Sequence, residues 1–97
     1  MKIVFLAFAK PDLRWFKRYY MYVFPEGRRN ADQHYYALLN LLKSSPTIGG
    51  LAEDFPDARE HHIKNTPFTL IYRIQPDRVE ILRLLDERNS FSNERKR

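Results

Sequence analysis

The sequence predicts a single α+β domain in which a hairpin of two helices packs on a mainly antiparallel sheet. Three observations favour this class. The chain has 97 residues, which is enough for one domain. Apolar residues between residues 11 and 42 recur at helical spacing. Three β-rich runs, separated by turn residues, fill residues 58–85. The expected element order is β-α-α-β-β-β over residues 1–97, with a charged C-terminal tail from about residue 87.

The first element is the short apolar run Ile3–Ala9, which ends before Pro11. Its β-branched and aromatic residues favour a buried strand. A secretory signal would continue into a cleavage site with small residues, and a membrane span would be far longer. We therefore expect neither a signal peptide nor a membrane segment here.

Two helices are expected next, because the apolar period changes at Pro11. Proline is accepted in a first helical turn, and Pro25–Gly27 is a turn signal that ends this helix. A second helix follows, and the short connection predicts an antiparallel hairpin. The residues expected to face the core are Leu13, Phe16, Tyr20 and Val23 on the first helix, and Ala31, Tyr35, Leu38, Leu39 and Leu42 on the second.

The rest of the domain is predicted to be a loop and three strands. Ser44–Asp57 contains two prolines and two glycines, so it is expected to be a loop. The strands are expected at Ala58–Lys64, Phe68–Ile74 and Val79–Leu85, with a hairpin turn at Pro76-Asp77 between the last two. The middle strand is apolar on both faces, which is typical of a central strand covered on both sides.

Composition limits the chemistry that the chain can perform. Cysteine is absent, which excludes disulfides and thiolate metal sites and fits a reducing compartment. No glycine-rich phosphate loop, nucleophile motif or paired-carboxylate motif is present, and no cofactor is expected. The net charge of +5 indicates either good solubility or an anionic partner, and it does not distinguish nucleic acid from an acidic protein.

Histidine offers little prospect of a metal site. His61 and His62 are neighbours on a predicted strand, so their side chains should point to opposite faces. The chain has only one further histidine, His34. We therefore expect no metal site.

Cationic side chains of the predicted sheet could bind phosphate. The residues concerned are Arg59, Lys64, Tyr72, Arg73 and Arg83. Arginine binds two phosphate oxygens at once, and such a surface could cleave RNA if one group took the proton of the 2′-hydroxyl. The structural alternative is that the arginines of the last two strands pair with Glu80 and Asp86.

A second aromatic stripe lies on the first helix. Trp15, Tyr19 and Tyr22 recur at i, i+4 and i+7, off the stripe that is expected to face the core. Such a stripe is either the edge of the core or an exposed patch for a partner. We favour the partner, because aromatic side chains are good interface anchors.

Three segments resemble the RelE/ParE toxin superfamily of bacterial type II toxin–antitoxin systems, and are closer to ParE. Residues 58–63 (AREHHI) match an R-E-x-x-I/V strand, residues 68–74 (FTLIYRI) a strand ending in Y-R-I/V, and residues 79–85 (VEILRLL) an I-L-R-V-L strand. Pro46 followed by Gly49 is similar to the P-x-x-G approach to that sheet.

The resemblance implies a cytoplasmic toxin that a cognate antitoxin neutralises, and that reaches operator DNA only through the antitoxin. ParE-like members inhibit DNA gyrase without cutting a substrate, whereas RelE-like members are ribosome-dependent mRNA endonucleases. Thr69 and Asp86 stand where RNase-active relatives carry a basic residue and a histidine. A carboxylate there would repel the scissile phosphate, so the gyrase-inhibiting class is favoured.

Candidate residues follow for each role. An RNase would use Lys64, Tyr72, Arg73 and Arg83, whereas target contacts would come from Arg59, Arg73, Arg83, Arg88 and Arg95, with Lys96 and Arg97 of the tail. The antitoxin would contact Trp15, Tyr19 and Tyr22. A third hypothesis is a degenerate, non-toxic member that only binds an antitoxin.

Overall fold

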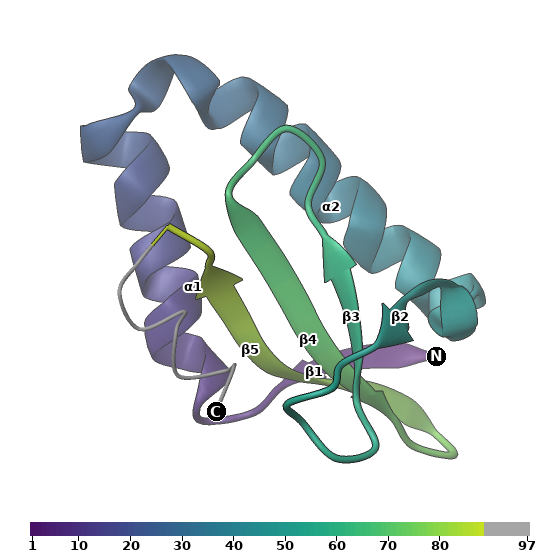
Figure 1. Ribbon diagram of the computed structural model, residues 1–97. Helices are drawn as coiled ribbons and strands as arrows, with labels where there is room; N and C mark the ends of the chain where they lie inside the picture. The colour runs from purple at the N-terminus through teal and green to yellow at the C-terminus, as the bar shows by residue number, and fades with distance from the viewer. Residues whose placement is uncertain (89–97) are drawn as a thin grey trace.

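Two helices cover one face of a five-stranded sheet in the computed structural model, which describes residues 1–88 (Figure 1). The helices are α1 (Ala9–Arg18) and α2 (Arg28–Ser44). The strands are β1 (Lys2–Phe5), β2 (Gly50–Leu51), β3 (Arg59–His62), β4 (Phe68–Ile74) and β5 (Arg78–Asp86). The predicted α+β class and helix hairpin are confirmed, and the helices diverge from the hairpin tip towards the sheet (Figure 1).

The sheet is mainly antiparallel, as predicted. Its order is β1-β5-β4-β3-β2, and only β1 runs parallel to its neighbour, with Ile3 opposite Val79. β4 is the central strand, and its residues Leu70, Ile71 and Tyr72 are fully buried. Leu70 and Tyr72 pack under the helices, whereas Ile71 packs with Ala52, Ala58 and Leu85 on the other face. The prediction of a strand covered on both sides is therefore confirmed.

The first strand is shorter than the predicted Ile3–Ala9. β1 ends at Phe5, and the backbone N–H of Ala9 already donates to the carbonyl of Leu6 at 3.0 Å. The apolar run continues past the strand because its last residues turn into α1. The helix begins early enough to hold Pro11 in its first turn, where a proline needs no hydrogen-bond partner.

The end of the first helix also differs from the prediction. Tyr19–Val23 form a π-helical turn, in which the N–H of Phe24 donates to the carbonyl of Tyr19 at 2.8 Å. The extra residue in this turn shifts the helical period. Val23, expected in the core, is consequently exposed, whereas Tyr19 is buried. The other residues predicted to face the core are buried or packed against it.

The long connection contains a strand that sequence patterns did not indicate. Within the predicted loop Ser44–Asp57, residues Pro46–Ile48 form a 3-10 turn and Gly50–Leu51 form β2. β2 pairs antiparallel with β3, with Gly50 opposite Glu60. Two residues are too few to show a strand period, so this fifth strand was not predictable.

Candidate functional site

Three of the four motifs that carry the family resemblance meet in one hydrogen-bonded cluster. The buried hydroxyl of Tyr72 donates to the carbonyl of Pro46 at 2.6 Å and accepts from the N–H of Gly49 at 2.9 Å. Arg59 donates to the carbonyls of Gly49 at 2.8 Å and Thr47 at 3.4 Å. Burial raises the pKa of Tyr72, although the N–H of Gly49 acts against it. A neutral, doubly bonded phenol in the core holds the loop to the sheet.

Gly49 allows this close approach. A Cβ atom at this position would lie 2.5 Å from the hydroxyl of Tyr72 and 2.7 Å from the carbonyl oxygen of Glu60. Its neighbour Gly50 has nothing within 4 Å. Packing therefore requires glycine at position 49, the glycine of the P-x-x-G segment, and does not require it at position 50.

Arg73 is paired across the strands, as the structural alternative predicted. Its guanidinium donates to Glu80 at 2.8 and 3.1 Å, and this carboxylate is buried and also accepts from Gln75 and Arg78. Hydrogen bonds from Arg73 first, then from Gln75 and Arg78, lower the pKa of Glu80 to about 2. Arg73 therefore neutralises a buried carboxylate.

Arg83 pairs with a helix residue that sequence analysis had not singled out. It donates to the carboxylate of Asp12 at 2.6 and 3.1 Å, and the same carboxylate accepts from the backbone N–H of Leu84 at 3.0 Å. The expected pair with Asp86 is thus wrong. β1 pairs with β5 only as far as Ile81. Beyond that point Asp12 takes over as the hydrogen-bond partner along the edge of β5.

Asp86 forms a third cluster with the end of β5 and with α1. It accepts from the indole of Trp15 at 3.0 Å and from the guanidinium of Arg88 at 3.0 and 3.1 Å. Arg88 also donates to the hydroxyl of Tyr19 at 2.7 Å, and its guanidinium lies 4.2 Å from that ring's centre. Burial acts to raise the pKa of Asp86, but the hydrogen bonds from Arg88 and Trp15 outweigh it and hold the pKa below its ordinary value.

The four residues expected of an RNase are not brought together. Lys64 lies in the turn that leads from β3 to the start of β4, whereas Arg73 lies near the other end of β4. The strand from Phe68 to Arg73 spans about 17 Å at roughly 3.3 Å per residue. Tyr72 and Arg73 are neighbours on β4, so they point to opposite faces. Arg83 is directed to Asp12 on α1. No single phosphate can contact all four.

The aromatic stripe divides between the core and the surface. Trp15 packs against the core and Tyr19 is buried, whereas Tyr22 has 74% of its surface exposed. Of the three candidates for antitoxin contact, Tyr22 is therefore the one open to a partner. The tail residues Arg95, Lys96 and Arg97 lie outside the described residues.

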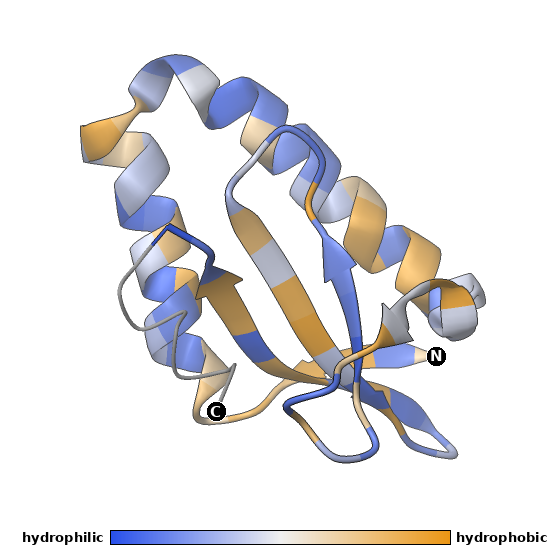
Figure 2. Cartoon of the chain, in the orientation of Figure 1, coloured by the Kyte–Doolittle hydropathy of each residue, from blue (hydrophilic) through white to orange (hydrophobic). Residues whose placement is uncertain are grey.

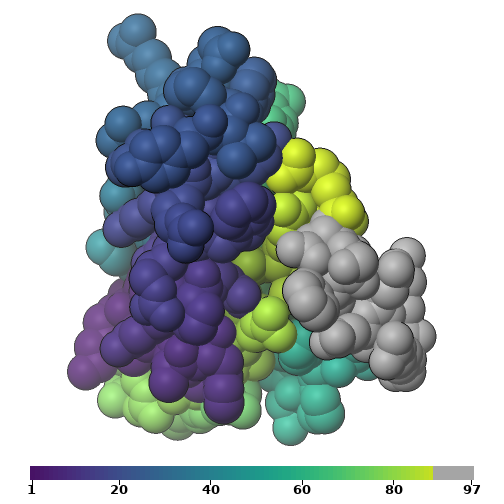
Figure 3. All heavy atoms as spheres, turned by 90° about the vertical axis from the view of Figure 1, so that its left-hand side faces the viewer, coloured from purple at the N-terminus to yellow at the C-terminus, as the bar shows by residue number. Residues whose placement is uncertain are grey.

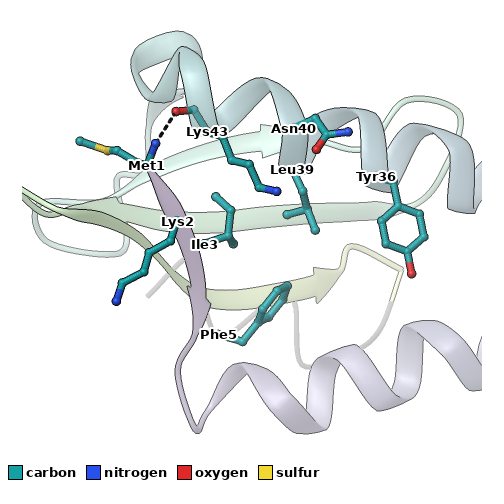
Figure 4. Close-up of a pocket in the computed structure, with 8 residues that line it drawn as sticks. All are labelled: Met1, Lys2, Ile3, Phe5, Tyr36, Leu39, Asn40 and Lys43. Atoms are coloured by element: carbon teal, nitrogen blue, oxygen red, sulfur yellow. Dashed lines mark hydrogen bonds between the residues drawn. The ribbon is translucent and has the colours of Figure 1, made fainter.

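A groove runs between the edge strand β1 and α2 (Figure 4). Its volume is about 670 Å³, and the side chains of Ile3, Phe5 and Leu39 form its apolar part. The N-terminal ammonium donates to the carbonyl of Lys43 at 2.9 Å at one end (Figure 4). Within residues 1–88, the side of β1 that faces away from β5 has no strand partner.

The histidines do not form a metal site in the part of the chain that the structure describes. The Nδ1 atom of His61 lies 2.9 Å from the carbonyl oxygen of His62, to which it can donate, and His62 contacts the hydroxyl of Thr69 at 3.3 Å. No three metal-binding side chains are grouped among residues 1–88. Over the same residues, no helix is both long enough and apolar enough to cross a membrane.

Two helices on one face of this five-stranded sheet define a ParE-like toxin fold. The structure resembles a chain from the chromosomal ParDE TA system of P. aeruginosa, with a TM-score of 0.66 and 23% identity over 87% of this chain and 92% of that one. The family described as ParE toxin of type II toxin-antitoxin system, parDE, matches residues 3–91. The chain belongs to this family. No curated protein sequence matches it significantly.

Proposed function

We propose that this chain is a toxin that inhibits DNA gyrase by binding, without covalent chemistry of its own, and that a cognate antitoxin neutralises it in the cytoplasm. Membership of the ParE toxin family supports the toxin role. The observation that carries the binding mechanism is the dispersal of Tyr72, Arg73 and Arg83. The hydroxyl of Tyr72 is buried between two backbone groups, and Arg73 and Arg83 each neutralise a carboxylate.

RNA cleavage needs a base at the 2′-hydroxyl and cations around the same phosphate. Tyr72 is a poor base in its present environment, because burial favours its neutral form. Asp86, where RNase-active relatives place a histidine, is held as a carboxylate by Arg88 and Trp15. These features favour a toxin that acts by occupying its target.

The antitoxin surface that we propose is the β1 edge together with the groove beside α2. An extended segment could add a strand to β1 and place apolar side chains on Ile3, Phe5 and Leu39. Lys2 and Lys43 border the groove, so an acidic segment is favoured. Antitoxin segments that fold on binding suit such an edge. Contact with operator DNA would then be made through the antitoxin.

A supercoiling assay tests the proposal. Purified toxin should block supercoiling by gyrase, and an equimolar amount of the antitoxin should restore it. Undisturbed gyrase at a large excess of toxin would count against the proposal. Primer extension on translated mRNA is the control for the RelE-like alternative: codon-positioned cuts that disappear in Tyr72→Phe would establish an endonuclease instead. If expression of the chain alone leaves growth unaffected, the degenerate, antitoxin-binding alternative is favoured.

A further inference from the structure

Three of the cations that form no ion pair among residues 1–88 lie at the tip of the helix hairpin. Arg59, Arg73, Arg83 and Arg88, expected as target contacts, all have internal partners. Lys17, Arg18 and Arg29 flank the hairpin turn and form no ion pair within residues 1–88. The nearby acidic residues are Glu26 and Asp32, of which Asp32 pairs with Arg28 at 3.7 Å. The tip therefore keeps a positive charge.

The same tip exposes four consecutive apolar residues. The exposed fractions are 46% for Met21, 74% for Tyr22, 60% for Val23 and 46% for Phe24. A turn between two helices is ordinarily polar, and exposed aromatic residues of this kind mark interfaces. In Figure 2 part of the turn between the helices is orange, next to blue segments, and Figure 3 shows the hairpin turn at the top, above the body of α1.

The apolar run is held in shape by its neighbours. The π-helical turn ends at Val23, and Pro25 starts a 3-10 turn directly after Phe24. The ring of Phe24 lies over Gly27, where a Cβ atom would be only 2.5 Å from it. The ring centres of Phe24 and Tyr20 are 6.3 Å apart. A fixed turn loses less conformational entropy on binding than a flexible one.

A small polar cavity opens beside the run. Its volume is about 240 Å³, and it is lined by Lys17, Tyr20, Met21, Arg28, Asp32 and Tyr36. Lys17 is unpaired on one wall, and the exposed Arg28–Asp32 pair on another is weak. A carboxylate side chain of a partner would find the cation of Lys17 here, next to apolar contacts from Met21.

We propose that the hairpin tip (Lys17, Met21–Phe24 and Arg29) is the surface that docks on the target, against a segment of DNA gyrase that carries both acidic and apolar side chains. The inference rests on the proposed function and names the docking surface for it. Charge complementarity favours an acidic occupant over a second copy of this chain, because two tips would repel each other. The apolar run disfavours nucleic acid, which is bound chiefly through its phosphates. Tyr22, expected at the antitoxin interface, is thereby assigned to the target.

Two sets of variants test this in the supercoiling assay. Tyr22→Ser with Val23→Ser removes exposed apolar surface, and we expect at least a tenfold rise in the toxin concentration that gives half inhibition. Leu51→Ser is the matched control, because Leu51 is 77% exposed on β2, away from the hairpin. Arg29→Glu should weaken inhibition most at low salt, whereas Lys10→Glu, with the same change in charge two turns before Lys17, should not.

The outcomes separate this inference from the proposed function. If the wild-type chain inhibits gyrase and the tip variants inhibit it equally well, the docking surface lies elsewhere and the proposed function stands. Loss of antitoxin affinity with unchanged inhibition would assign the tip to the antitoxin. A wild-type dimer that the tip variants dissociate, at unchanged inhibition, would assign it to self-association. Wild-type chain that leaves gyrase undisturbed overturns both proposals. Thermal unfolding of each variant excludes misfolding.

Discussion

The indole N–H of Trp15 donates a hydrogen bond to the carboxylate of Asp86 at 3.0 Å, which ties the first helix to the end of the last strand. The same carboxylate holds Arg88, whose guanidinium covers the ring of Tyr19. The family resemblance implies a histidine at this position in an RNase. Here a carboxylate joins α1 to β5, so the position has a structural role.

Replacing Asp86 with Asn should destabilise the fold by about 1–2 kcal/mol, because hydrogen bonds to a charged acceptor are lost and Arg88 is left without its counter-charge. Chemical denaturation measures this directly. Trp15 is the only tryptophan, so its fluorescence reports the junction. Asp77→Asn is the control, because Asp77 pairs only at the surface and its loss should stay within about 0.5 kcal/mol. Equal effects of the two variants would contradict the structural role.

Gly49→Ala should destabilise the chain by about 1–3 kcal/mol, because the added methyl group collides with the hydroxyl of Tyr72 and the carbonyl of Glu60. Gly50→Ala is the matched control, since nothing lies within 4 Å of its Cβ position. Thermal unfolding of both variants decides the matter. The losses from Gly49→Ala and Tyr72→Phe should be less than additive in the double variant, because the hydroxyl that collides with the new methyl group is already gone, although the contact with the carbonyl of Glu60 remains.

The lowered pKa of Glu80 makes the stability of the fold sensitive to acid. Its folded-state pKa of about 2 lies below the ordinary value of about 4.3 that it has in the unfolded chain. The unfolded state therefore binds the proton first as the pH falls. The stabilisation from Glu80 is complete above about pH 4.3 and is lost as the pH falls towards 2.

Glu80→Gln should thus reduce the change in unfolding free energy over this pH range. The control is Glu26→Gln, because Glu26 is exposed in the hairpin turn, and this variant should have the same pH profile as the wild type. Denaturant titrations at several pH values between 2 and 5 provide the measurement. If the unfolding free energy of Glu80→Gln changed with pH as steeply as that of the wild type, other carboxylates would be responsible for the acid sensitivity.

Sequence periodicity predicted the elements whose residues are numerous enough to show a period. β4 runs over Phe68–Ile74 as expected, and Ala31, Tyr35, Leu38 and Leu42 of α2 face the core. The π-helical turn was not predictable. It holds one residue more than an α-helical turn, and its amino-acid composition is no different from that of an α-helix. Val23 was misplaced for that reason.

The sequence predicted which residues belong to the candidate site better than it predicted what those residues do. Arg59, Tyr72 and Arg83 were singled out by motif, but their partners are backbone carbonyls or a helix carboxylate far away in the chain. A single sequence does not indicate which acidic residue an arginine will meet. The one signal for Asp12 was its place in the first turn of α1, where an acidic residue also has a local explanation.

The ion pair between Asp12 and Arg83 joins α1 to the edge of β5. Asp12→Ala should cost about 1–3 kcal/mol, because it removes the carboxylate that accepts from the guanidinium of Arg83 and from the N–H of Leu84. Arg83→Ala should cost less, since the Leu84 hydrogen bond survives. In the double-mutant cycle we expect a coupling of about 1 kcal/mol that falls in high salt.

The same pair decides whether Arg83 is structural or a target contact. A structural arginine predicts that Arg83→Ala lowers stability while the folded variant inhibits gyrase as well as the wild type does, because its guanidinium is committed to Asp12. A target contact predicts the reverse, with near-normal stability and weaker inhibition. Measuring both quantities on one preparation, at a temperature where each variant is folded, separates the two. Weakened gyrase inhibition by fully folded Arg83→Ala would indicate that the sheet, and not the hairpin tip, contacts the target.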